Sequence, residues 1–312
     1  MQSFLGRLRA TWLGALLVLA LAFPAFAGPP GHVVVFRDSV SDPGNAFEIL
    51  GKVTVPPFLK LVPDAPYARG GHHFSNGQTW IEQVTKAGPA LRNPGVFFNY
   101  AVGGARARTA GAYDLTGQVS RYLADAGGQA DPDAIYVIWI GGDDLRDALE
   151  ALAMDPSGAQ SGLILQQAIG VIQNNLGLLR GAHARNFLVA NLPDLGLTPE
   201  ARLQGPLAQA AARALAQQFN AGLEQMLSGQ EAPGVTIARL DIFALLDDVV
   251  AAPPSFGLTN VVGPCIRLNT TTQPYCNEPD AYLFWDGIHP TVAGHRIIGQ
   301  RAKAVIGVTW PR

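Results

Sequence analysis

A serine, an aspartate and a histidine are the residues of this sequence best placed to do chemistry. Ser39 follows the apolar run at residues 33–36, after Arg37 and Asp38, and the Ser, Asp, Pro and Gly residues beyond it are typical of a loop. Ligands bind at the carboxyl ends of strands in open α/β sheets, so a serine at this place can be a nucleophile. The alternative is a polar strand cap, and partners elsewhere in the chain must decide between the two.

Asp286 and His289 could supply the base for such a serine. They stand three positions apart, with Gly287 between them and Pro290 after them. On a short turn both side chains can face one way, so that the aspartate orients one imidazole nitrogen and the other takes a proton from a serine. The pattern alone is weak, because an aspartate before a helix is also a common N-cap. We expect the other histidines to lie at the surface or in packing roles, at positions 32, 72, 73, 183 and 295.

Strands that alternate with helices must position these residues. Apolar runs predict strands at 32–36, 96–101, 134–140, 186–190 and 235–240. Helical spacing predicts helices at 80–87, 115–126, 161–184, 204–227, 243–250 and 291–306, and we expect residues 252–282 to be irregular. This alternation predicts a parallel sheet covered on both faces in one domain.

Composition excludes several classes of protein. The 312 residues are 48% hydrophobic and 15% charged, with a formal net charge of −2, which argues against disorder. There is no run of Lys and Arg, so we expect no nucleic-acid partner.

The first 27 residues have the pattern of a secretory signal peptide. Arg7 and Arg9 precede an apolar stretch at 12–23, and an Ala-Phe-Ala cleavage site ends at Ala27. We therefore expect a periplasmic or secreted protein with a mature domain at 28–312. No later segment approaches the roughly 18 apolar residues of a membrane span, so we expect no transmembrane segment after removal of the signal peptide.

Cys265 and Cys276 are the two cysteines of the sequence, and both lie in the mature part. In an oxidising compartment we expect them to form a disulfide. The alternative is a metal site, but further Cys or His ligands at finger-like spacing are missing.

Together these motifs resemble the GDSL, or SGNH, family of serine hydrolases, in its branch of bacterial secreted esterases and autotransporter-type lipases. The matching blocks are 36–45, 99–105, 141–144 and 286–291, supported by 74–77 and 191–196. The resemblance implies a three-layer αβα sandwich around a five-stranded parallel sheet, a flavodoxin-like α/β fold.

The resemblance also implies an exported serine esterase or lipase. Ser39 would attack the acyl carbon, His289 would be general base and then acid, and Asp286 would hold the histidine. The oxyanion hole would comprise the N–H groups of Ser39 and Gly104, with Asp143 at its third position. We expect no metal or organic cofactor, a small-molecule or lipid ester as substrate, and a monomer. The alternative is a catalytically weak or inactive binding protein of the same fold.

The ester itself stays open among lipid, choline-ester and sugar-acetate substrates. Trp139 and Trp285 lie beside the third and last blocks and could line an aromatic pocket suited to a quaternary ammonium group. For Trp139, core packing is the commoner alternative.

Two residues depart from the family pattern. Arg37 stands where the family has glycine, and Asp143 stands where it has the asparagine that donates to the oxyanion. An ionised aspartate cannot donate, and the loss of one such donor costs about 10²–10³ in rate. Because the two strand ends are neighbours in the implied fold, we predict that Arg37 pairs with Asp143. The alternative is that Arg37 points to solvent.

Overall fold

The computed structural model describes residues 31–86 and 97–311. The predicted signal peptide at 1–27 lies outside the described residues, as do the last residue of the helix predicted at 80–87 and the first of the strand predicted at 96–101. In the described part, no helix is both long enough and apolar enough to cross a bilayer.

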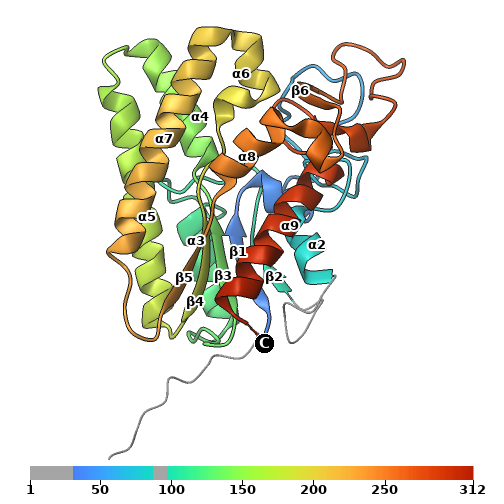
Figure 1. The fold of residues 1–312 in the computed structure, drawn as a ribbon. Helices are drawn as coiled ribbons and strands as arrows, with labels where there is room; N and C mark the ends of the chain where they lie inside the picture. Colours follow the sequence, from blue (N-terminus) through green and yellow to red (C-terminus); the bar gives the residue numbers. More distant parts are fainter. Residues whose placement is uncertain (1–30, 87–96, 312) are drawn as a thin grey trace, which may run out of the picture.

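Five parallel strands form the central sheet in the order β2-β1-β3-β4-β5, with helices on both faces (Figure 1). The fold class predicted from the sequence is confirmed. The strands are β1 (Val33–Arg37), β2 (Phe97–Asn99), β3 (Ile135–Trp139), β4 (Asn186–Ala190) and β5 (Thr236–Leu240). β1 lies between β2 and β3, so the chain segments that follow these three strands emerge side by side.

Alternate side chains of β1 enter two different cores. Val34 and Phe36 pack on one face, which is covered by α3 (Leu115–Asp125), α4 (Gly142–Met154), α5 (Ala159–Gly181) and α7 (Pro206–Ser228). Val33 and Val35 pack on the other, which is covered by α2 (Trp80–Lys86), α8 (Ile242–Ala251) and α9 (Val292–Thr309). This period of two explains why the strands read as continuous apolar runs.

Three helices and a second sheet are missing from the sequence prediction. The helices are α1 (Asn45–Leu50), α4 and α6 (Pro199–Gln204). Residues 252–282 are not wholly irregular, because β6 (Asn260–Pro264) pairs with β7 (Tyr282–Phe284). For α4 the misleading signal was the Gly-Gly pair: Gly141 caps the helix at φ +116° and sits so close to Phe219 that a Cβ would lie 2.8 Å from its ring.

A small apolar cluster lies beside the second sheet, apart from both main cores. Cys265 and Cys276 are joined there by a disulfide, with their Cα atoms 4.8 Å apart. The other buried members of this cysteine cluster are Phe58, Tyr67, Ile266 and Trp285. Backbone N–H groups of Cys265 and Ile266 donate to the carbonyl of Trp285, at 3.1 and 2.9 Å. The cluster therefore holds the chain immediately before Asp286.

Candidate active site

The structure brings Ser39, His289 and Asp286 into one hydrogen-bonded row. His289 Nε2 lies 2.8 Å from Ser39 Oγ, and His289 Nδ1 lies 2.7 Å from Asp286 Oδ2. Asp286 is fully buried, whereas Ser39 keeps 8% of its surface exposed. In this geometry the imidazole can take the serine proton while the aspartate fixes its tautomer.

The serine follows the end of β1, where the backbone is held from the side by a glutamine. Gln118 of α3 accepts a hydrogen bond from the Arg37 N–H and donates one to the Arg37 carbonyl, both at 2.9 Å. The chain then turns into the 3₁₀ helix η1 (Ser39–Ser41), which Asp38 caps by accepting from the Val40 N–H at 3.2 Å. The cap and the strand end together fix the direction in which Ser39 points.

Side-chain hydrogen bonds tie the segment after β1 to the segment after β2. Asp42 accepts from the N–H of Gly103 at 2.8 Å, and Asn99 donates to the carbonyl of Ser41 at 2.7 Å. Gly104 has a left-handed φ of +81° and open space where a Cβ would be. Among the described residues, the N–H groups of Ser39 and Gly104 have no partner. Free backbone donors of this kind can receive an oxyanion.

Tyr67 is a site residue that sequence reasoning missed. Its hydroxyl donates to Asp286 Oδ2 at 2.9 Å, while Asp286 Oδ1 accepts from the N–H groups of Ile288 and His289 at 2.9 and 2.8 Å. Burial, followed by the Asp286 carboxylate, raises the pKa of Tyr67 above its usual value, so its proton stays in place as a donor. Tyr67 follows a Pro-rich stretch with no periodicity, and no local signal could have identified it.

Asp143 lies in the first turn of α4 and lines the same pocket as Ser39. Burial, and then the Asp38 carboxylate, raise the pKa of Asp143 to about 6, against the opposing charges of Arg146, Arg106 and His289. The side chain of Asp143 is 13% exposed, and its ion pair is with Arg146 at 3.5 Å.

The predicted ion pair between Arg37 and Asp143 is wrong. Arg37 Nη1 donates instead to Asp38 Oδ1 at 2.9 Å, and the guanidinium lies 3.4 Å from the centroid of the Trp139 ring. The reason is the strand alternation: Arg37 shares its face with Val33 and Val35, whereas α4 packs on the opposite face. Nor does Arg37 point to solvent, because it is 3% exposed.

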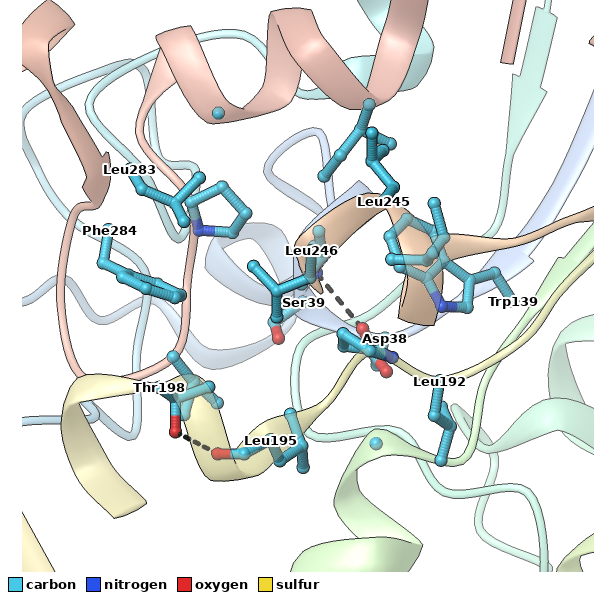
Figure 2. Close-up of a pocket in the computed structure, with 18 of the residues that line it drawn as sticks. Asp38, Ser39, Trp139, Leu192, Leu195, Thr198, Leu245, Leu246, Leu283 and Phe284 are labelled. Atoms are coloured by element: carbon cyan, nitrogen blue, oxygen red, sulfur yellow. Dashed lines mark hydrogen bonds between the residues drawn. The ribbon is translucent and has the colours of Figure 1, made fainter. Parts of the chain in front are cut away.

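The pocket beside Ser39 is lined mostly by aliphatic side chains (Figure 2). Trp139 belongs to this lining, with the Arg37 guanidinium over its ring, but Trp285 does not. Trp285 is buried in the cysteine cluster against Tyr67 and Tyr275. The apolar members come from the segment after β4, from α8, from β7 and from α9, and include Leu192, Leu195, Leu245, Leu246, Leu283, Phe284 and Ile297.

A parallel αβα sandwich with a serine, a histidine and an aspartate aligned at the carboxyl edge of its sheet has the architecture of a serine hydrolase. The family model described as GDSL-like Lipase/Acylhydrolase matches residues 33–302, and the chain belongs to this family. The resemblance seen in the sequence is thereby confirmed, and family membership predicts ester hydrolysis as the reaction class.

Relatives of known name support the same class. The chain is 35% identical over 202 residues to esterase EstA of Pseudomonas aeruginosa, covering 61% of this chain and 29% of that protein. It is 26% identical to the phosphatidylcholine-sterol acyltransferase of Aeromonas hydrophila, over 91% of each chain. Among solved structures, a catalytic mutant of the acetylxylan esterase Axe2 from Geobacillus stearothermophilus aligns with a TM-score of 0.51 at 16% identity, over 92% of this chain and 99% of that one, and shares the fold.

Proposed function

We propose that this chain is a serine esterase that cleaves carboxylic esters through Ser39, His289 and Asp286. The observation that carries the proposal is the continuous row of short hydrogen bonds from Ser39 Oγ to Asp286 Oδ2. Ser39 attacks the acyl carbon as His289 takes its proton, and His289 then protonates the leaving alcohol. The Ser39 and Gly104 N–H groups stabilise the tetrahedral oxyanion. Water releases the acyl group by the same steps.

The lining of the pocket favours an ester with an apolar acyl group. An apolar acyl group that binds against the leucines and isoleucines around Ser39 stabilises the complex by about 25 cal/mol per Å² of apolar surface buried. They offer few hydrogen-bond partners to the hydroxyls of a sugar. We therefore rank aliphatic acyl esters before sugar acetates and choline esters.

We also propose that the protein is exported to the periplasm or the medium. The support is the composition of residues 1–27, the disulfide between Cys265 and Cys276, and the esterase relative from Pseudomonas. Mass spectrometry of the exported protein should find Gly28 as its first residue. A first residue at Met1 would contradict the proposed cleavage.

One observation favours a second candidate, a binding protein with weak or absent catalysis. Asp143 replaces the family asparagine of the oxyanion hole, and as a carboxylate it would repel the developing charge. Such a protein would keep the pocket and bind esters without turning them over.

Hydrolysis of p-nitrophenyl esters of increasing acyl length separates the two candidates. We expect turnover by the native chain, and a loss of about 10³-fold or more in kcat for Ser39→Ala, with Asp286→Asn and His289→Ala similarly impaired. Double variants should lose little more, because the three residues act as one unit. Ser157→Ala, at an exposed serine between α4 and α5, is the matched control. Full activity in Ser39→Ala would rule out the esterase mechanism, and saturable binding without turnover by the native chain would favour the binding protein.

A further inference from the structure

Two carboxyl groups stand together at the ends of neighbouring strands beside Ser39. Asp38 follows β1, and its side chain approaches Gly142 closely. A Cβ atom added to Gly142 would lie 3.3 Å from Asp38 Oδ2. Asp143 is the next residue after Gly142, and Asp38 and Asp143 line the same pocket. Asp38 Oδ1 is occupied by the Arg37 guanidinium and the Val40 N–H. The Asp38 carboxylate disfavours the ionised form of Asp143.

Asp143 has an ion pair with Arg146 at 3.5 Å, but among the described residues it lacks the hydrogen-bond donors that usually hold an ionised carboxylate in a largely buried place. In the described part of the chain it accepts no hydrogen bond, and the guanidinium nearest to it, Arg146, donates twice to Glu200, at 3.2 and 3.0 Å. The next residue, Asp144, differs: it is fully buried, and it accepts N–H bonds from Ala107 and Arg108 at 2.7 and 3.1 Å. The same helix end thus carries one carboxylate that is held by donors and one carboxyl group that is not.

The charged groups around Asp143 come from several elements, and the positive ones oppose burial and Asp38. Arg106 is committed to Asp147, to which it donates at 2.6 and 2.8 Å. Burial and Asp38 are the two largest influences and both raise the pKa of Asp143, to about 6. The titratable and charged side chains that act on Asp143 are Arg37 at the end of β1, Asp38 after it, Arg106 after β2, Arg146 on α4 and His289 before α9. Asp147 on α4 and Glu200 on α6 are the partners of Arg106 and Arg146.

We propose that Asp143 works as an un-ionised carboxylic acid whose O–H donates to the oxyanion, in place of the amide donor of the family asparagine. This inference rests on the proposed esterase function of the same site. A neutral carboxyl group has one O–H donor, and a buried aspartic acid can keep it near neutral pH in an apolar site. Aspartic acid at position 143 then keeps the number of donors in the oxyanion hole and changes only the pH range over which the third donor is present.

The proposal sets two opposite proton requirements on one reaction. His289 must be neutral to take the serine proton, which favours higher pH, whereas Asp143 must be protonated to donate, which favours lower pH. Activity should therefore fall on the alkaline side, above the pKa of Asp143. At pH 8, two units above a pKa of about 6, roughly one molecule in 10² keeps the proton.

The test is the pH dependence of kcat/KM for the native chain and for Asp143→Asn, with a p-nitrophenyl ester as substrate. We expect an alkaline decline in the native chain and none in Asp143→Asn, which donates at every pH. Asp143→Asn should be about 10²-fold faster than the native chain at pH 8 and within a few-fold at pH 5. Asp155→Asn, at the other end of α4, should keep the native decline. A constant ratio between Asp143→Asn and the native chain at all pH values would overturn the proposal while leaving the esterase function intact.

A stability measurement decides the protonation state even if no variant hydrolyses the ester. An acid whose pKa is raised on folding binds more protons in the native than in the unfolded state, so it destabilises the fold as pH rises. The Tm of the native chain should thus fall relative to that of Asp143→Asn mainly between about pH 4 and pH 6, from the usual pKa of an aspartic acid to the raised pKa of Asp143, and the difference should stay constant above that range. Parallel Tm profiles would overturn the proposal independently of catalysis. Full activity in Ser39→Ala would reject the proposed esterase function, whereas the Tm profiles test the protonation of Asp143 whether or not the chain hydrolyses esters.

Discussion

The two halves of the candidate site are built in different ways. Ser39 and Gly104 lie in loops that follow adjacent strands of the main sheet. These loops are fixed by side-chain hydrogen bonds such as those of Gln118 and Asp42. The half that carries Asp286 and His289 stands beyond the sheet. It is supported by a small cluster with a disulfide and by the hydroxyl of Tyr67.

This difference indicates where each half gets its rigidity. Strands β1 and β3 lie between the two main cores, and β2 pairs with β1, so their ends are held by the stability of the whole domain. The turn at residues 286–289 draws on local contacts, which can open without unfolding the sheet. We therefore expect substitutions in the first half to change geometry and stability together, and substitutions in the second half to change catalysis first.

Outside the three proposed catalytic residues, the largest effect should come from Asp42→Asn in the sheet-based half. Asp42 is fully buried and accepts from three backbone N–H groups, those of Gly44, Ala46 and Gly103. An asparagine leaves at least one of them unpaired, at a cost of about 1–3 kcal/mol, and shifts the loop that carries Gly104. We expect kcat to fall by about 10²-fold, as for a misplaced oxyanion donor, and Tm to fall with it.

Asp155→Asn changes the same group at a distant turn and should alter kcat less than two-fold. Steady-state kinetics and thermal unfolding of both variants provide the check. Native kcat in Asp42→Asn would show that the loop of Gly104 is held by other contacts.

A smaller and more selective effect is expected for Tyr67→Phe in the outer half. Loss of the hydroxyl removes a donor from the buried Asp286 carboxylate, and a hydrogen bond to a charged group contributes about 1.5–3 kcal/mol. Two backbone N–H bonds to Asp286 remain, so we expect kcat to fall about ten-fold with KM unchanged.

Tyr275→Phe is the matched control, because Tyr275 stacks on Trp285 in the same cluster and makes no side-chain hydrogen bond in the described structure. It should keep native kcat. Equal losses in the two variants would mean that Tyr67 acts through packing of the cluster instead of through its hydroxyl.

The parts of the molecule that the sequence predicted are those with local signals. Runs such as residues 186–190 are apolar and bounded by polar residues, and that strand has the predicted ends. Ser39, Asp286 and His289 stood in recognisable blocks of the sequence, although Asp286 and His289 follow β7 of the second sheet and not a strand beside β1.

The parts that the sequence could not predict depend on which face an element covers. Arg37 shares a face with Val33 and Val35 by simple alternation, yet nothing local shows that α4 packs on the opposite face. Tyr67 reaches Asp286 across 219 positions of the chain, from a segment without periodicity. Both depend on tertiary packing that residue spacing does not encode.

The smallest effect on kcat, and the sharpest test of the difference between the halves, should come from removing the disulfide. Titration of the unreduced, denatured protein should find no free thiol, since both cysteines are paired. Closing a loop of this size stabilises the folded state by roughly 3 kcal/mol in the chain-entropy model. Both cysteines lie in the cluster beside Asp286, so we expect the loss of the disulfide to weaken that cluster most. At 25 °C, Cys265→Ser with Cys276→Ser should therefore retain kcat within about two-fold, because Tyr67 and the backbone bonds still hold the turn. On heating, activity should disappear several degrees before the far-ultraviolet circular dichroism of the sheet and helices is lost, whereas in the native protein the two transitions should lie closer together. Coincident loss of activity and secondary structure in the serine variant would mean that the outer half has no separate stability, and that the sheet positions the whole site.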